Sequence, residues 1–309
     1  MEYLLLIIGF ILLIKGADIF VEGSSNVAKA FGIPTVIIGL TLVAFGTSAP
    51  EAAVSIAAAV NHSSDISISN IIGSNLFNLF CVLGITALFR DVKANKEVIK
   101  KDYKLSIFSA ILLLVLILTN YFLGNSLVLT RISGVILLIV LICYLVNMIK
   151  SVKNDEKVVE KKKFSFKDII MIAIGLACVV FGGDLTVDAA TKIAQSWGLS
   201  ERFIGLTIVA IGTSLPELCT SLVALFKGEN DIAVGNVVGS NIFNILFILG
   251  ASSVLSPMMI NIETLIDLLI LIVGSIAVLF CFNKFVLKRE HGIGMLMFYV
   301  TYCIYIFIR

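Results

Sequence analysis

Two glutamates stand in stretches of sequence that are otherwise almost wholly apolar. The first stretch reads GLTLVAFGTSAPE and ends at Glu51, and the second reads GLTIVAIGTSLPE and ends at Glu217. A charged side chain at the centre of a bilayer costs roughly 3 kcal/mol or more unless it meets a partner, water or an ion. Because hard cations such as Ca²⁺ prefer carboxylate and carbonyl oxygens, two acids in equivalent places predict one shared cation site. The alternative, a buried acid paired with a base, is disfavoured because Lys15 is the only basic residue deep inside an apolar run.

Each glutamate directly follows a proline, and the chain has only four prolines. Pro50 and Pro216 donate no backbone hydrogen bond and clash with the carbonyl four residues earlier, so each is expected to break a helix. Irregular backbone at membrane depth is tolerated only where it is buried or lines a cavity. We therefore expect freed carbonyls beside each carboxylate to be ligands for Na⁺ or Ca²⁺, although a simple packing kink is the alternative.

Neutral oxygen-bearing side chains accompany the glutamates at helical spacing. Ser48 shares a helix face with Glu51, and Ser74 and Asn78 lie four residues apart on the next apolar run. Such oxygens suit the singly charged Na⁺. For one residue alone, a hydrogen bond between helices is as good an interpretation, but duplication of the whole set favours an ion site. The set comprises Ser48, Ser214, Ser74, Ser240, Asn78 and Asn244.

Other polar residues also match in pairs, and we interpret them mainly as structural. The asparagines are expected either to bridge broken helices, the interpretation we favour, or to line the ion pathway. The aspartates are expected to act in helix packing or gating. Asp18 follows Lys15 by about one helical turn, which predicts an ion pair. These matched residues are Asn70, Asn75, Asn236, Asn241, Asp18 and Asp184.

The matches belong to one long internal repeat with a constant offset of 166 residues. Half of the positions from Gly39 to Asn78 are identical to their counterparts from Gly205 to Asn244, and the second motif of each half reads NIIGSNLFN or NVVGSNIFN. The identities concentrate in polar and helix-breaking residues, which a functionless duplication has no reason to keep in both halves.

The composition predicts an all-α integral membrane protein. The chain is 59% hydrophobic and 14% charged, and a spanning helix needs roughly 20 mostly apolar residues. The long continuous runs exclude a β-barrel, whose strands alternate, and the N-terminal run lacks the flanks of a signal peptide. We predict ten spans: 2–28, 34–60, 66–89, 105–119, 127–149, 167–194, 200–226, 231–255, 261–283 and 291–308.

Five spans fall in each half, so the second half enters the membrane from the opposite side. This predicts an inverted repeat, 1–149 and 167–309, joined by a polar linker, 150–166, within one transport domain, with broken helices at the midplane as in many secondary transporters. Most of the 23 basic residues fall in loops on one side. The positive-inside rule places those loops in the cytoplasm and both termini outside, so that nucleic-acid binding is not needed to explain them.

GTSxPE followed by GSNxFN, each present twice, resembles the repeats of the cation/Ca²⁺ exchanger superfamily, and most of all the prokaryotic sodium/calcium exchangers. The resemblance covers essentially the whole chain. It implies a ten-helix antiporter in the cell membrane that exchanges Na⁺ for Ca²⁺, is not an enzyme and needs no cofactor beyond its transported ions. It carries no implication about oligomeric state.

The resemblance also implies an assignment of ligands. Glu51 and Glu217 would bind Ca²⁺ with the carbonyls of Thr47 and Thr213. The Na⁺ sites would use both glutamates, the carbonyls of Ala44 and Ala210, and the serine and asparagine set named above. Some relatives, including the potassium-dependent branch, carry aspartate where this chain has Asn244. The two formal charges of this site therefore argue against potassium transport.

Three rival functions remain open from the sequence. A Ca²⁺/H⁺ exchanger would use the same glutamates, although the surrounding serines and asparagines favour Na⁺. A cation channel would pass unitary currents too large for an exchange cycle. An intramembrane enzyme with an acidic dyad is disfavoured because the chain has no HExxH motif and no evident Ser/His/Cys arrangement.

Overall fold

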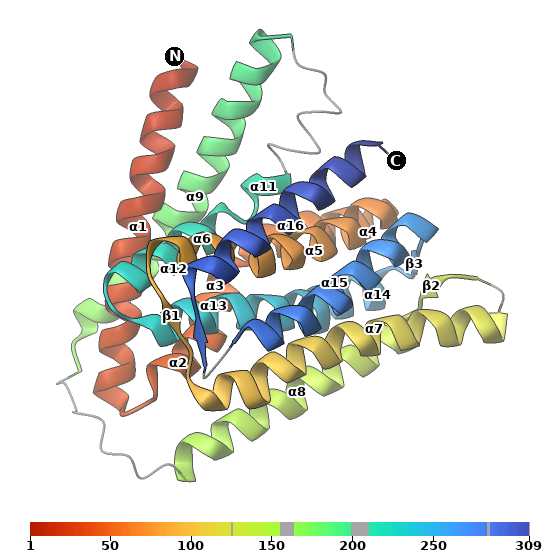
Figure 1. The fold of residues 1–309 in the computed structure, drawn as a ribbon, viewed down its shortest axis with the longest axis horizontal. Coiled ribbons are helices and arrows are strands. Elements are labelled where there is room, and N and C mark those ends of the chain that lie inside the picture. The colour runs from red at the N-terminus through yellow and green to blue at the C-terminus, as the bar shows by residue number, and fades with distance from the viewer. Residues whose placement is uncertain (125, 155–163, 199–209, 283–284, 309) are drawn as a thin grey trace. The chain divides into compact units, whose positions relative to one another are not determined.

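The computed structural model describes residues 1–308 except 125, 155–163, 199–209 and 283–284, and this part of the chain is nearly all helical (Figure 1). Eight described helices are long and apolar enough to span a membrane, and a ninth candidate is interrupted between Thr35–Thr47 and Ala49–Val60. The predicted linker lies mostly outside the described residues, as do the start of the predicted span 200–226 and the start of the second motif. An all-α fold was expected, but two short pairs of strands are present as well.

Contacts divide the chain into two compact units, and each unit takes segments from both halves of the repeat. Unit 1 consists of Met1–Pro50 and Lys157–Val237, and unit 2 consists of Glu51–Glu156 and Val238–Arg309. The helices of unit 1 are α1 (Glu2–Phe31), α2 (Thr35–Ile38), the π-helix η1 (Gly39–Val43), α3 (Ala44–Thr47), α9 (Phe166–Ser196), α11 (Ala210–Gly212), α12 (Leu215–Phe226) and the first part of α13 (Asn230–Phe243).

In unit 1, α1 and α9 lie side by side in antiparallel directions (Figure 1). Their glycines allow the backbones to approach closely. A Cβ atom built on Gly16 would lie 2.7 Å from the Cβ of Cys178, and one on Gly182 would lie 2.9 Å from the Cβ of Leu12. Small residues of this kind promote close packing of helices in membranes. Because Gly16 and Gly182 are repeat counterparts, the two contacts are equivalent in the two halves.

Unit 2 contains the remaining helices and all four strands that the structure describes. The helices are α4 (Ala49–Val60), which starts two residues before the unit boundary, α5 (Ser64–Phe77), η2 (Asn78–Val82), α6 (Leu83–Phe89), η3 (Val98–Asp102), α7 (Tyr103–Gly124), α8 (Arg131–Asn154), the end of α13, η5 (Asn244–Leu249), α14 (Gly250–Leu255), α15 (Ile262–Cys281) and α16 (Arg289–Ile308). The strands are β1 (Val92–Lys93), β2 (Val128–Leu129), β3 (Met258–Met259) and β4 (Val286–Leu287).

The packing of unit 2 also occurs in equivalent pairs. Strand β1 pairs with β4, and β2 pairs with β3, both antiparallel. Gly84 on α6 approaches Gly292 on α16, while its counterpart Gly250 on α14 approaches Gly134 on α8. Unit 2 therefore joins segments of the first half to segments of the second half.

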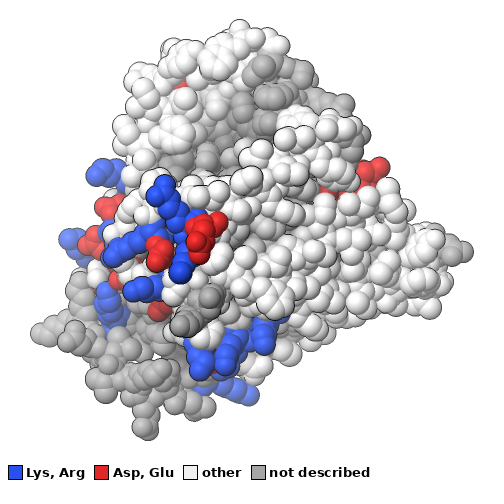
Figure 2. Space-filling model, viewed as in Figure 1, with Lys and Arg blue, Asp and Glu red and all other residues white. Residues whose placement is uncertain are grey.

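Large apolar side chains cover much of the outside of the long helices. On α1, Leu4, Ile7 and Ile11 are each more than half exposed. Broad areas of the face drawn in Figure 2 carry no charged side chain. An apolar exterior around a polar interior is the arrangement expected of a protein whose solvent is the bilayer.

Candidate functional site

The helix that leads to Glu217 is broken immediately before the glutamate. Helix α11 ends at Gly212, Ser214 has ψ 7°, and α12 begins at Leu215 with Pro216 in its first turn. A proline is tolerated there because the first helical N–H groups have no partner within the helix. Glu217 thus lies in the first turn of α12, where the helix dipole favours a negative charge, and it is fully buried.

Within unit 1, Glu217 receives a hydrogen bond from the other motif. The hydroxyl of Ser48 donates to Oε1 of Glu217 over 2.9 Å. Ser48 lies at the break between α3 and α4, with ψ 8°. Because Pro50 has no N–H to donate to Gly46, the helix is interrupted here. The helix breaks predicted from Pro50 and Pro216 are therefore present in the described residues, at Ser48 and Ser214.

Asn236 on α13 connects the parts of the site in unit 1. Its Oδ1 accepts a hydrogen bond from the hydroxyl of Thr47 over 3.0 Å. Its Nδ2 donates to the hydroxyl of Ser221 over 2.9 Å and to the carbonyl oxygen of Glu217 over 3.3 Å. All four residues are fully buried, so one amide holds the two motif segments of this unit together.

Glu51, in unit 2, has a related environment one repeat away. The hydroxyl of Ser74 donates to Oε1 of Glu51 over 3.3 Å. Nδ2 of Asn70 donates to the hydroxyl of Ser55 over 2.9 Å and reaches the carbonyl oxygen of Glu51 at 3.5 Å. Glu51 is fully buried. The Nδ2 contacts of Asn70 and Asn236 are therefore equivalent in the two units, and each amide connects two helices, which agrees with the favoured structural interpretation.

The structure describes the contacts of some of the remaining predicted ligands, and only the burial or the backbone of others. The carbonyl of Ala44 accepts the backbone N–H of Ser48 at 3.1 Å. The Thr47 hydroxyl also lies 3.3 Å from this carbonyl, but its one proton is shared with the shorter contact to Asn236. For Ala210 only the helical backbone is described. Ser214 and Ser240 are fully buried. The side-chain oxygen of Thr213 is buried and has no hydrogen-bond partner among the described residues.

Asn78 and Asn244 each begin a π-helical turn in unit 2, Asn78–Val82 and Asn244–Leu249. A π-helical turn inside a membrane helix is rare and often marks a functional site. Both asparagines are fully buried. No group of three or more His, Cys, Asp or Glu in the described part of the chain is placed to hold a metal ion.

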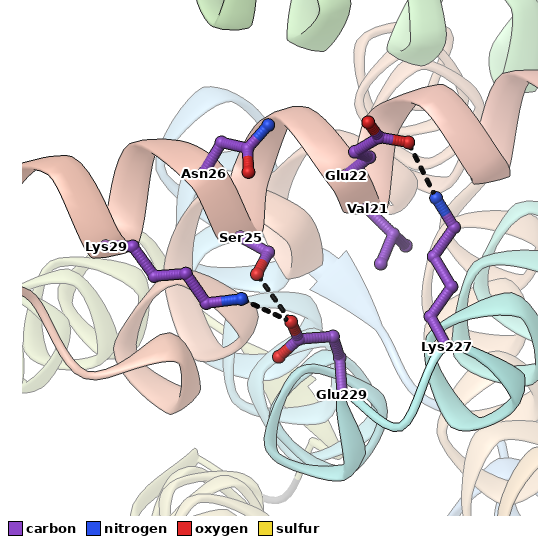
Figure 3. Close-up of a pocket in the computed structure, with 7 residues that line it drawn as sticks. All are labelled: Val21, Glu22, Ser25, Asn26, Lys29, Lys227 and Glu229. Carbon is purple, nitrogen blue, oxygen red and sulfur yellow. Dashed lines mark hydrogen bonds and ion pairs between the residues drawn. The ribbon is translucent and has the colours of Figure 1, made fainter. Parts of the chain in front are cut away.

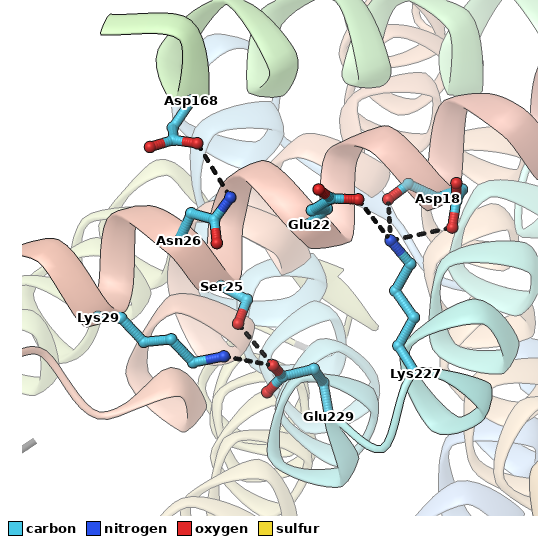
Figure 4. A network of polar contacts seen from close by, with 8 residues as sticks. All are labelled: Asp18, Glu22, Ser25, Asn26, Lys29, Asp168, Lys227 and Glu229. Atoms are coloured by element: carbon cyan, nitrogen blue, oxygen red, sulfur yellow. Dashed lines mark hydrogen bonds and ion pairs between the residues drawn. The ribbon is translucent and has the colours of Figure 1, made fainter. Parts of the chain in front are cut away.

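A separate polar network in unit 1 ties α1 to the turn between α12 and α13 (Figure 4). Nζ of Lys227 lies 2.9 Å from Oδ1 of Asp18 and 3.0 Å from Oε2 of Glu22. Asp18 therefore pairs with Lys227, and not with Lys15 as its spacing predicted. Burial lowers the pKa of Lys227, but its hydrogen bonds to Asp18 and Glu22 outweigh burial and raise that pKa above its ordinary value.

Glu229 forms the second connection between α1 and the same turn. It accepts hydrogen bonds from Ser25 over 2.6 Å and from Lys29 over 3.0 Å. Figure 3 shows these side chains around a cavity of about 260 Å³. The counterparts of Lys227 and Glu229 are Asn61 and Ser63, so the ion pairs of this network have no equivalents in the other repeat.

Sequence reasoning missed several of these residues. Ser55 and Ser221 match across the repeat four residues after each glutamate, which was a usable signal. No such signal pointed to the contact between Glu22 and Lys227, because the two residues are about 200 positions apart and the pair has no counterpart in the other repeat. The sequence carried no signal for the π-helical turns either, since one extra residue in a helical turn leaves the apolar pattern nearly unchanged.

Comparison with known families places the whole chain in one group. The family model described as "Sodium/calcium exchanger protein" matches residues 1–150 and 167–308. The putative antiporter CaxA of Alkalimonas amylolytica is 39% identical over 261 residues, which cover 81% of this chain and 80% of that protein. The sodium/calcium exchanger MaX1 of Methanosarcina acetivorans is 31% identical over 344 residues, which cover 99% and 98% respectively.

The fold is similar to that of a solved structure. The sodium-calcium exchanger NCX_Mj, soaked with 2.5 mM Na⁺ and 1 mM Sr²⁺, superimposes with a TM-score of 0.84 at 32% sequence identity. The match covers 97% of this chain and 96% of that one.

Proposed function

Since the chain belongs to the sodium/calcium exchanger family, we propose that it is a secondary antiporter that exchanges Na⁺ for Ca²⁺ across the cell membrane by alternating access. The observation that carries this proposal is the duplicated, fully buried glutamate that receives a serine hydroxyl bond in each unit. An exchanger is a transporter and not an enzyme, and its ions are substrates and not cofactors.

The proposed Ca²⁺ ligands are the carboxylates of Glu51 and Glu217 and the carbonyls of Thr47 and Thr213. Carboxylate and carbonyl oxygens are the ligands that Ca²⁺ prefers. The proposed Na⁺ ligands add neutral oxygens to the same two carboxylates. They are Ala44, Ala210, Ser48, Ser214, Ser74, Ser240, Asn78, Asn244, Glu51 and Glu217.

Coupling follows from the cost of uncompensated charge. Two bare carboxylates in a low dielectric are expensive, so the protein without ions crosses between its two access states slowly. Binding of Ca²⁺ or of Na⁺ neutralises the carboxylates and permits the crossing. Because both ions need the same glutamates, they compete, and one gradient drives the other ion.

We also propose that ten spans form two inverted repeats of five, 1–149 and 167–309, with the lysine-rich loops in the cytoplasm and both termini outside. Equivalent glycine contacts between α1 and α9, and between the paired helices of unit 2, support the inverted relation. The basic loops support the orientation.

The test is an ion flux assay on the purified protein in vesicles. Vesicles loaded with Na⁺ and diluted into ⁴⁵Ca²⁺ should take up Ca²⁺, and uptake should follow the Na⁺ gradient but not a pH or K⁺ gradient. Uptake driven by a pH gradient alone would instead identify a Ca²⁺/H⁺ exchanger. Unitary currents in planar bilayers would identify a channel.

The glutamates are tested by Glu51→Gln and Glu217→Gln, which keep size but remove the charge. Each should reduce exchange by about 100-fold or more, because losing one partner of a buried charge site costs roughly 3 kcal/mol. Glu97→Gln is the matched control, since its carboxylate is 61% exposed beside Lys101. Normal exchange in either of the first two variants contradicts the proposed ligands.

A further inference from the structure

Four buried asparagines of the two GSNxFN motifs form a crosswise hydrogen-bond network in unit 2. Nδ2 of Asn75 donates to the backbone carbonyl of Asn241 over 3.2 Å, and Nδ2 of Asn241 donates to that of Asn75 over 3.3 Å. Nδ2 of Asn244 donates to Oδ1 of Asn75 over 2.9 Å, and Nδ2 of Asn78 donates to Oδ1 of Asn241 over 3.3 Å. Each ligand candidate is therefore held by an asparagine of the opposite repeat.

This network determines which way each amide faces. A backbone carbonyl only accepts hydrogen bonds, so the NH₂ groups of Asn75 and Asn241 must point at the carbonyls they contact. Their Oδ1 atoms must then face Asn244 and Asn78. An amide that faces an oxygen must present its NH₂ group. Hence the orientation of all four amides follows from two fixed backbone carbonyls, in the same way that Asn and Gln orientations are generally assigned from the surrounding hydrogen bonds.

The outcome is two oxygen atoms aimed away from the network. Oδ1 of Asn78 and Oδ1 of Asn244 are buried, and neither accepts a hydrogen bond from any described residue. A buried acceptor without a partner is costly, whereas a cation or a water bound to a cation satisfies it. Both asparagines also begin π-helical turns, which alter the direction of a side chain relative to a regular helix.

We propose that Asn75 and Asn241 are positioning residues for Na⁺, and that they act crosswise: Asn75 orients the amide oxygen of Asn244, and Asn241 orients that of Asn78. The inference rests on the proposed function, in which Asn78 and Asn244 are Na⁺ ligands. It assigns to Asn75 and Asn241 a role in ion preference, because a reversed amide would present NH₂ to a cation and repel it.

Single variants give the first test. Asn75→Ala and Asn241→Ala in vesicles should each raise the Na⁺ concentration that half-saturates Ca²⁺ exchange by about fivefold to tenfold, the effect of one hydrogen bond. Ca²⁺–Ca²⁺ exchange without Na⁺ should change less than twofold, because these asparagines do not hold the proposed Ca²⁺ ligands. Ser253→Ala is the matched control, since it removes a buried hydroxyl whose contacts among the described residues are the nearby backbone carbonyls of Leu249 and Gly250.

Double-mutant cycles test the crosswise pairing, because residues that act through each other give non-additive effects. Asn75→Ala should not raise the half-saturating Na⁺ concentration further when Asn244→Ala is already present, but it should raise it by its full effect when combined with Asn78→Ala. Asn241→Ala should add nothing to Asn78→Ala and its full effect to Asn244→Ala. A network with only a structural role has no reason to give this exchange of partners.

The outcomes separate the two proposals. If Asn244→Ala and Asn78→Ala leave the Na⁺ dependence unchanged, the proposed Na⁺ ligands are wrong. If those two variants shift it but Asn75→Ala and Asn241→Ala do not, or add to both partners equally, the positioning role is wrong. Asn75→Ser and Asn241→Ser are milder changes that control for misfolding of the alanine variants. Loss of Ca²⁺–Ca²⁺ exchange in the alanine and serine variants of both residues also overturns the positioning role.

Discussion

At the scale of residues, a serine hydroxyl beside each buried carboxylate sets the chemistry. Ser48 donates to Glu217 over 2.9 Å, and Ser74 donates to Glu51 over 3.3 Å. A hydroxyl has one proton to donate and two acceptor lone pairs. The same oxygen can therefore stabilise the carboxylate in one state and bind Na⁺ in another, which a backbone N–H cannot do.

Ser48→Ala is expected to weaken Na⁺ binding about fivefold, because the hydroxyl is lost both as a proposed ligand and as a hydrogen-bond donor worth about 1 kcal/mol. Ser74→Ala should have a smaller effect, since its hydrogen bond is longer. The measurement is the Na⁺ dependence of ⁴⁵Ca²⁺ exchange in vesicles, with Ser253→Ala as the control. An unchanged half-saturating Na⁺ concentration in Ser48→Ala would argue against this serine as a ligand.

At the scale of elements, glycines determine how closely α1 and α9 pack. A Cβ on Gly16 would lie 2.7 Å from the Cβ of Cys178 and 2.9 Å from the backbone nitrogen of Val179. Neither is the end of a flexible side chain, so the two helices would have to separate. The close approach compensates for the absence of a hydrophobic driving force between helices in lipid.

Gly16→Val should therefore lower the apparent melting temperature of the detergent-purified protein by several degrees. Overpacking of a tight contact typically costs about 1–3 kcal/mol, and about 1 kcal/mol corresponds to roughly 2–4 °C for a chain of 150–250 residues. Gly294→Ala is the matched control, because a Cβ there meets nothing within 4 Å. Equal melting temperatures for Gly16→Val and the wild type would show that the helices tolerate separation.

At the scale of the whole molecule, the proposed orientation depends on where the basic loops lie. Lys96 stands between β1 and η3, in a lysine-rich segment, whereas Ser126 stands between α7 and β2, where basic residues are few. The positive-inside rule assigns these two segments to opposite sides.

Cysteine labelling in intact cells checks this assignment. In a variant whose six native cysteines are replaced by alanine, Ser126→Cys should react with a membrane-impermeant maleimide, and Lys96→Cys should react only after permeabilisation. Each variant serves as the other's control. The reverse pattern would place the lysine-rich loops outside and invert the proposed topology.

Several features of the candidate site could be predicted from the sequence alone, because the two copies of the repeat can be compared with each other. The buried positions of Glu51 and Glu217 and the breaks before Pro50 and Pro216 follow from local rules, since a proline cannot continue a helix wherever it lies. The bridging role of Asn236 also agreed with expectation. The ion pair expected for Asp18 did not, because helical spacing identified a nearby lysine while the fold supplied Lys227 from a distant turn.

Composition and motif comparison were enough to identify a membrane protein, its duplicated motifs and the residues proposed to bind a cation, because composition and helix-breaking chemistry act locally. Which side chains meet could be learned only from the folded chain: Ser48 contacts Glu217, and Asn75 contacts Asn244. Those partners come from opposite halves of the chain and depend on how helices pack. The direction of each amide was likewise beyond the sequence, because it depends on backbone carbonyls that only the folded chain brings into reach.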